Sequence, residues 1–98
     1  MRRAPPLDID GAEGIAITAL GFLASEPERL ARFMALSGIT PDELRRQARS
    51  RQMQAAILDH MLADESLLLV FAAGAGLPPE RIAPAADLLR GEGRRSRP

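Results

Sequence analysis

Few residues in this 98-residue chain have side chains that could form a chemical site. His60 is its only histidine, and Asp64 follows at the four-residue spacing that puts two side chains on one face of a helix. One imidazole with the scattered carboxylates of Asp59 and Glu65 is an incomplete ligand set, because metal sites gather several such ligands. We therefore expect no metal site. We interpret His60 as a half-buried packing residue and Asp64 as a turn or helix-capping residue.

The sequence also lacks the groups on which most enzymes depend. It has no Cys and no Tyr. The Gly-x-Gly at residues 74–76 ends a predicted helix and does not follow a strand, as a phosphate- or dinucleotide-binding loop does. An active site needs convergent polar groups with tuned pKa values, and no such set is evident. We predict that the protein is not an enzyme, has no catalytic residues and uses no cofactor.

A cluster of basic residues is the second candidate site. Acidic and basic residues balance at 13 each, and every basic residue is Arg. A predicted helix, the Gly38 turn and the next helix resemble a helix-turn-helix, which would present four side chains to nucleic acid: Arg45, Arg46, Arg49 and Arg51. The zero net charge and the acidic start of the same helix favour a solvated face instead. Weak nucleic-acid binding is therefore the alternative function.

The elements that would position these residues are helices. Hydrophobic residues make up 46% of the chain and charged residues 27%, which is an ordinary balance for one globular domain. Capping boxes predict three helix starts, at Asp10 with Glu13, Ser25 with Glu28, and Thr40 with Glu43. Gly38, Gly76 and Gly91 predict helix ends, and Pro84 predicts a kink or a short turn before a helix that starts near Ala83.

A continuous apolar run at residues 67–73 predicts the centre of the fold. Such a run covers the whole circumference of a helix, so we expect the helix over residues 64–75 to be the most buried element. The run is too short to cross a bilayer, which takes roughly 20 apolar residues. We expect no membrane association.

An internal repeat indicates how the helices are organised. A shift of 38 residues aligns Phe33 with Phe71, Gly38 with Gly76 and Pro41 with Pro79, and it places a helix break near Asp64. The alternative is that apolar helices of similar length align by chance. We predict an all-α, compact orthogonal bundle of about six short helices, built as a duplicated three-helix unit with halves at about 12–50 and 51–90. The helical domain spans 10–90, between a mobile arm at 1–9 and a disordered Arg-rich tail at 91–98.

The first predicted helix carries more apolar surface than one contact needs. Ile17 and Phe22 lie off its core-facing stripe, so they are the candidate contacts with a protein partner or with a second copy in a homodimer. The partner itself is unknown. We predict a non-catalytic helical module for protein–protein interaction.

Two segments, ITALGFLASEPERLARFMALSGITPDEL and ILDHMLADESLLLVFAAGAGLPPE, resemble a family of short bacterial proteins of unknown function. The resemblance covers roughly residues 12–82 and is most specific around PERLARF and LADESLLLVF. It implies an all-helical fold and a cytoplasmic bacterial setting, and it supplies no catalytic residues. Members of the family tend to have an aromatic residue where this chain has His60, which agrees with a packing role for that ring.

Overall fold

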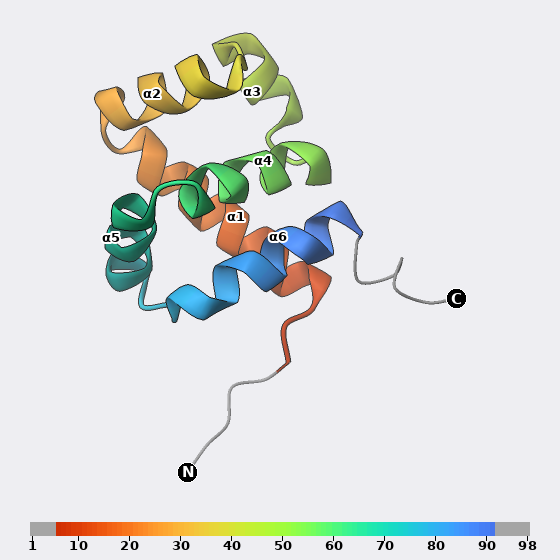
Figure 1. Ribbon diagram of the computed structural model, residues 1–98. Helices are drawn as coiled ribbons and strands as arrows, with labels where there is room; N and C mark the ends of the chain where they lie inside the picture. The colour runs from red at the N-terminus through yellow and green to blue at the C-terminus, as the bar shows by residue number, and fades with distance from the viewer. Residues whose placement is uncertain (1–5, 92–98) are drawn as a thin grey trace.

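Helical turns account for most of residues 6–91, the part of the chain that the computed structural model describes. No strand occurs in this range, so the predicted all-α class is confirmed. Residues 1–5 of the predicted arm and residues 92–98 of the predicted tail lie outside the described residues. The described elements are α1 (Ile9–Ala24), α2 (Pro27–Ser37), α3 (Pro41–Gln47), α4 (Arg51–Leu62), α5 (Glu65–Ala75), the 3-10 turn η1 (Pro79–Arg81) and α6 (Ile82–Arg90) (Figure 1).

One of the three predicted capping boxes is confirmed. At the start of α3 the Glu43 backbone N–H donates to Thr40 Oγ1 (3.1 Å), and the Thr40 N–H donates to Glu43 Oε1 (2.9 Å). The predicted break near Asp64 is also confirmed, because Asp64 caps α5 by accepting from the Leu67 N–H (3.2 Å). In both cases a side-chain oxygen satisfies a donor that has no partner within the helix.

The other two capping predictions are wrong. Asp8 is the cap of α1 and accepts from the Gly11 N–H (2.8 Å), so the helix begins at Ile9, inside the arm predicted over 1–9. Ser25 ends α1 instead of starting α2, because its hydroxyl donates to the carbonyl of Phe22 (2.7 Å). In each case a hydrogen bond to a residue three positions away competes with the predicted cap.

The predicted helix ends agree with the structure. Gly38, Gly76 and Gly91 adopt φ values of 77°, 69° and 80°, the left-handed conformation that favours glycine at a helix end. Of the two alternatives predicted for Pro84, a kink or a short turn before a new helix, the structure has the second. The short turn η1 precedes α6, which starts at Ile82. Pro84 lies in the first turn of α6, where its missing N–H costs little.

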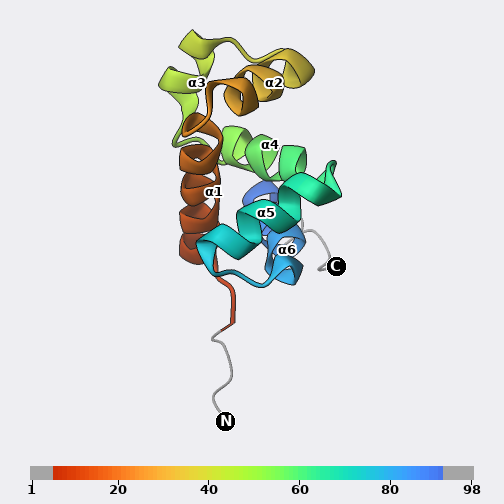
Figure 2. The same cartoon turned by 90° about the vertical axis from the view of Figure 1, so that its left-hand side faces the viewer.

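The centre of the fold is α4 and not α5. In Figures 1 and 2, α4 lies between the α2–α3 pair and α6, while α1 runs along one side of the molecule. Six residues of α4 are buried, and α4 packs most extensively against α6. Arg90 of α6 links the two helices by donating to both carboxylate oxygens of Asp59 on α4 (2.7 and 2.8 Å).

The prediction that residues 64–75 form the most buried element is therefore wrong. Phe71 and Ala72 are the buried residues of α5, while Leu69 and Val70 are 48% and 52% exposed. The helix covers the side of the bundle with one face and leaves the opposite face open (Figure 2). An apolar run identifies a helix that could be packed on every side, but the described part of the chain supplies partners for one side of α5 only.

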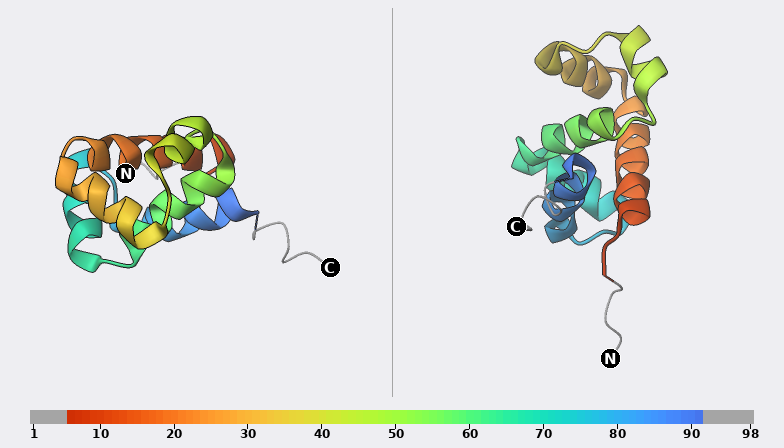
Figure 3. Two further views of the ribbon diagram at one scale, coloured as in Figure 1. Left: turned by 90° about the horizontal axis from the view of Figure 1, so that it is seen from above. Right: turned by 90° about the vertical axis from the view of Figure 1, so that its right-hand side faces the viewer.

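The bounds of one pair of helices follow the 38-residue offset at both ends. Helix α2 covers residues 27–37 and α5 covers 65–75, so both ends differ by 38. Each helix buries one phenylalanine, Phe33 or Phe71, and each ends at a left-handed glycine. The α2–α3 pair nevertheless stands apart from the rest of the bundle in the side view of Figure 3, whereas α6 packs against both α4 and α1. The duplication itself stays a prediction.

Candidate interaction surface

The outer face of α1 is made of apolar and small residues. Ile17 is 56% exposed, as the prediction of a partner contact requires. Its neighbour Thr18 is also exposed, as are Gly14 and Gly21, one turn to either side of Ile17. The Thr18 hydroxyl donates to the carbonyl of Gly14 (2.9 Å). This bond satisfies the hydroxyl within the helix, so the face offers no polar group that would need a partner.

Phe22, the second predicted contact, occupies a different environment. Its ring is half-buried and lies 5.4 Å from the ring of Phe71, in a tilted arrangement that joins α1 to α5. The guanidinium of Arg29 lies over the Phe22 ring, 4.2 Å from its centroid. Phe22 is therefore an anchor between helices, and it also lines a surface hollow.

That hollow joins the outer faces of α1 and α5. It has a volume of about 280 Å³ and is lined by Thr18, Phe22, Phe71, Gly74 and Ala75. Beyond it, the outer face of α5 exposes Ser66, Leu69, Val70 and Ala73. We call the combined area of these two faces and the hollow the uncharged surface, because residues 14–25 and 66–79 contain no charged residue. Sequence reasoning missed its α5 half, since the apolar run predicted burial.

The four arginines predicted to line one helix do not share one. Arg45 and Arg46 lie on α3, Arg49 lies in the following turn and Arg51 is the first residue of α4. Asp42 pairs with both arginines of α3, at 3.3 and 3.6 Å, and Arg51 reaches Glu13 of α1 at 3.5 Å. The arrangement differs from a recognition helix, because the arginines are spread over three elements and most have an acidic neighbour.

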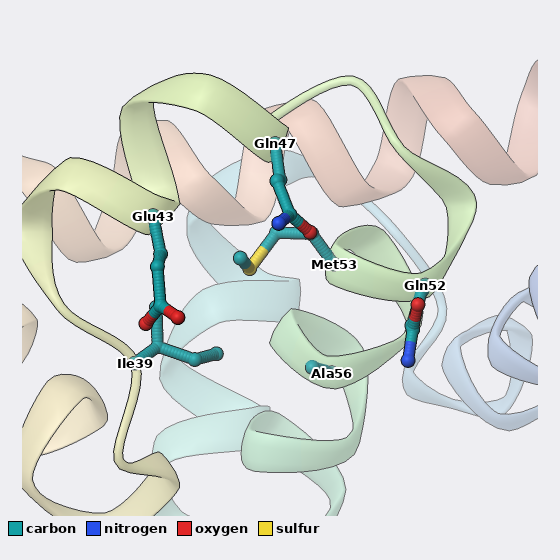
Figure 4. Close-up of a pocket in the computed structure, with 6 residues that line it drawn as sticks. All are labelled: Ile39, Glu43, Gln47, Gln52, Met53 and Ala56. Carbon is teal, nitrogen blue, oxygen red and sulfur yellow. The ribbon is translucent and has the colours of Figure 1, made fainter.

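A second hollow lies between α3 and α4, with a volume of about 190 Å³ (Figure 4). The side chains of Glu43 and Gln47 extend from α3 toward Ile39 and Met53. Glu43 is already engaged, because the hydrogen bonds from the Thr40 backbone and side chain hold its pKa below the ordinary value. The hollow therefore offers amides and a thioether but no free nucleophile or base.

His60 lines a third hollow, between α2 and the α4–α5 turn, together with Arg32 and Asp64. Its half-buried ring packs edge-on against Phe33, with ring centroids 5.1 Å apart, as the packing interpretation predicts. Burial, followed by the nearby Arg32 charge, lowers the pKa of His60, and Asp64 acts weakly in the opposite direction. Among residues 6–91, no three His, Cys, Asp or Glu side chains gather as a metal site would require.

Buried polar groups offer no further site. Gln54 on α4 is the one buried polar side chain among the described residues, at 2% exposure. Its amide nitrogen donates to the carbonyl of Ala48 (3.4 Å), while its Oε1 has no hydrogen-bond partner. The contact ties the α3–α4 turn to α4, and Gln54 lines none of the three hollows described above.

Comparison with known proteins gives one match. A model of a family described as a protein of unknown function (DUF3572) matches residues 9–92, nearly the whole helical domain. No curated protein and no solved structure matches the chain. Within the described part of the chain, no helix has the length and apolar character needed to span a membrane.

Proposed function

The chain belongs to the DUF3572 family, whose description assigns no activity, and we propose that it is a non-catalytic helical module for protein–protein interaction. The uncharged surface is the contact area. Ile17 lies at the centre of its α1 half, and Phe22 borders the hollow that joins the two halves. The proposal also places the protein in a bacterial cytoplasm, in keeping with a chain that has no cysteine and so no disulfide.

One observation carries the proposal. Ile17, Leu69 and Val70 are each about half exposed, although a small domain gains stability from every apolar group it buries. They belong to two neighbouring helices whose residues 14–25 and 66–79 include no charged residue, which distinguishes them from the singly scattered apolar residues found on most surfaces. Exposed apolar area of this kind marks interaction sites in small proteins.

The experiment is capture of partners with tagged full-length protein, using two variants and a matched control. Ile17→Asp and Val70→Asp each place a charge on the uncharged surface, and we expect both to abolish capture. Leu36→Asp is the control, because Leu36 is 66% exposed on α2, away from the uncharged surface. Circular dichroism would show that all three variants are folded. Partners retained by Ile17→Asp but lost by Leu36→Asp would contradict the proposal.

The alternative of weak nucleic-acid binding has less support. Asp42 pairs with both Arg45 and Arg46 and offsets one of their two charges, and the other two predicted contacts lie on different elements. Binding through phosphate contacts weakens steeply as salt rises. We therefore expect no retention of nucleic acid on a filter at physiological salt and no change at low salt when Arg46 is replaced by Ala. Salt-dependent retention that this variant reduces would favour the alternative.

A further inference from the structure

We propose that the α2–α3 pair, residues 27–47, is a hinged lid over α4 that opens as one unit while α1, α4 and α6 stay packed together. The closed lid covers one face of α4 (Figure 1), and opening uncovers that face together with Phe33. The proposal does not depend on the uncharged surface or its partner. It rests on the bonds that join the helices, the hollows beneath the pair and the connections at its two ends.

Polar bonds join the other helices to one another but do not join the α2–α3 pair to them. Arg90 of α6 donates to Asp59 of α4, and Arg51 at the start of α4 pairs with Glu13 of α1 at 3.5 Å. In the described part of the chain, no ion pair or hydrogen bond links residues 27–47 to α1, α4, α5 or α6. Opening the lid therefore breaks none of the bonds that hold the rest of the bundle.

The side chains that keep the lid closed are few. Phe33 is the buried residue of α2 and Leu44 that of α3, whereas α4 buries six residues. The Phe33 ring packs on His60 of α4, and Arg29 lies over Phe22 of α1. Hollows lie on both sides of these contacts, about 190 Å³ between α3 and α4 and about 340 Å³ between α2 and the α4–α5 turn. A contact interrupted in this way opens at a lower free energy than a continuous core.

The turn between α2 and α3 keeps the two helices together as they move. The Ile39 N–H donates to Ser37 Oγ at the end of α2 (3.2 Å), and the Thr40 N–H donates to Glu43 Oε1 at the start of α3 (2.9 Å). These bonds lie within the pair, so they persist when it leaves α4. The lid therefore opens as a unit and not as two separate helices.

The connections at the two ends of the pair are the hinges. Ser25 and Glu26 link α1 to α2, and residues 48–50 link α3 to α4. Short segments at the ends of helices are where hinge motions are usually absorbed. At the second hinge, the buried Gln54 amide donates to the carbonyl of Ala48 over 3.4 Å and its Oε1 has no partner. Opening there gives this acceptor access to water, which lowers the cost of the motion.

The test is native-state hydrogen exchange of the full chain, followed by NMR at increasing urea below the unfolding transition. We expect the amides of α2 and α3 to exchange through one shared opening, at least about tenfold faster than those of α4 and α6. This opening should depend less on urea than global unfolding does, because it exposes less surface. Amides around Phe33 that exchange as slowly as those of α4, with the same urea dependence, would overturn the lid.

Two matched variants test whether the pair moves as a unit. Leu44→Ala removes the buried side chain of α3, so we expect exchange to rise about tenfold in α2 as well as in α3 and to change little in α6. Ile82→Ala, 38 residues on, is the control: it should speed exchange in α4 and α6 and leave α2 and α3 unchanged. Circular dichroism would show that both variants are folded. Faster exchange in α3 alone would overturn the concerted opening.

A covalent lock provides a second test. The chain has no cysteine, so Gln47→Cys with Ala56→Cys can be joined specifically by a short bismaleimide across the hollow between α3 and α4 (Figure 4). We expect the lock to bring the exchange of α2 amides to the rate of α4 amides. The same variant before linking is the control and should keep the fast opening. A lock that leaves α2 exchanging as in the unlinked variant would overturn the proposal.

Discussion

Helices α2 and α5 have the same length and the same position in the 38-residue offset, but they present opposite outer faces. Their inner faces agree, since each buries one phenylalanine, Phe33 or Phe71. The outer face of α2 carries Glu28 and Arg32, and the aligned positions of α5 carry Ser66 and Val70. All four of these residues are exposed.

The difference between the outer faces of α2 and α5 shows which of their features the fold requires. Helix α2 shows that a helix in this kind of position packs with a charged outer face. The apolar outer face of α5 is therefore not required by packing within the chain, and it leaves Leu69 and Val70 in contact with solvent.

The largest effect is expected at the inner faces. Phe33 and Phe71 are fully buried, at 0% and 1% exposure, so replacing either by alanine should lower the free energy of unfolding by about 3–5 kcal/mol. Urea unfolding followed by circular dichroism measures the loss. A much smaller loss for Phe71→Ala than for Phe33→Ala would show that the two inner faces are not equivalent.

The next largest loss of stability is expected in α6, and a smaller one at the matching position of α3. Leu44 of α3 and Ile82 of α6 are 38 residues apart, and both are buried. Because α6 packs against α4 and α1 while α3 lies at the edge, Ile82→Ala should cost about 2–5 kcal/mol and Leu44→Ala clearly less. The same urea experiment applies. Equal costs would mean that α3 is as firmly packed as α6.

Exchanging the outer faces should have little effect on the monomer. Val70→Arg gives α5 the residue that α2 has at the aligned position, and its effect on the free energy of unfolding should stay within about 0.5 kcal/mol, because Val70 is 52% exposed. The measurement is urea unfolding at a concentration where the chain is monomeric. A loss of several kcal/mol would show that Val70 supports the fold after all.

The smallest effect is expected at His60, where α2 meets the start of α5. Burial lowers its pKa below the ordinary value of 6.5, so the unfolded chain binds a proton more readily than the folded one. The His60 contribution to stability is therefore fully present above pH 6.5 and is lost as the pH falls through the folded pKa. NMR titration of the imidazole should give a pKa below 6.5, and His60→Phe should remove this part of the pH dependence. A pKa above 6.5 would contradict the assignment.

Local signals in the sequence predicted local structure well. Thr40 with Glu43, Asp64, Gly38 and Gly76 all act at helix ends as expected, because a cap depends on residues within one turn. The start of α1 was missed because Asp8 and Asp10 are both plausible caps two residues apart, and only the backbone decides between them.

The burial of each helix was harder to predict. Leu69 and Val70 belong to the most apolar run of the chain, yet their exposure depends on whether another element covers α5. Periodicity describes one helix, whereas the arrangement that makes α4 central is a property of the whole bundle. Ile17 was identified as exposed because it lies off a clear stripe, which is a signal within its own helix.

The long separation in sequence between α1 and the helices that cover it, α4 and α6, has a consequence for synthesis of the protein. Helix α1 leaves the ribosome before the other described helices, but the helices that cover its Ala12, Ala16 and Ala19 stripe are α4 and α6, and α6 ends at Arg90. Chains are made from the N-terminus at about 5–20 residues per second. The first half of this chain therefore waits for nearly the whole sequence before its apolar stripe is covered, and a nascent chain that stops before residue 82 exposes that stripe to the translation machinery and its chaperones.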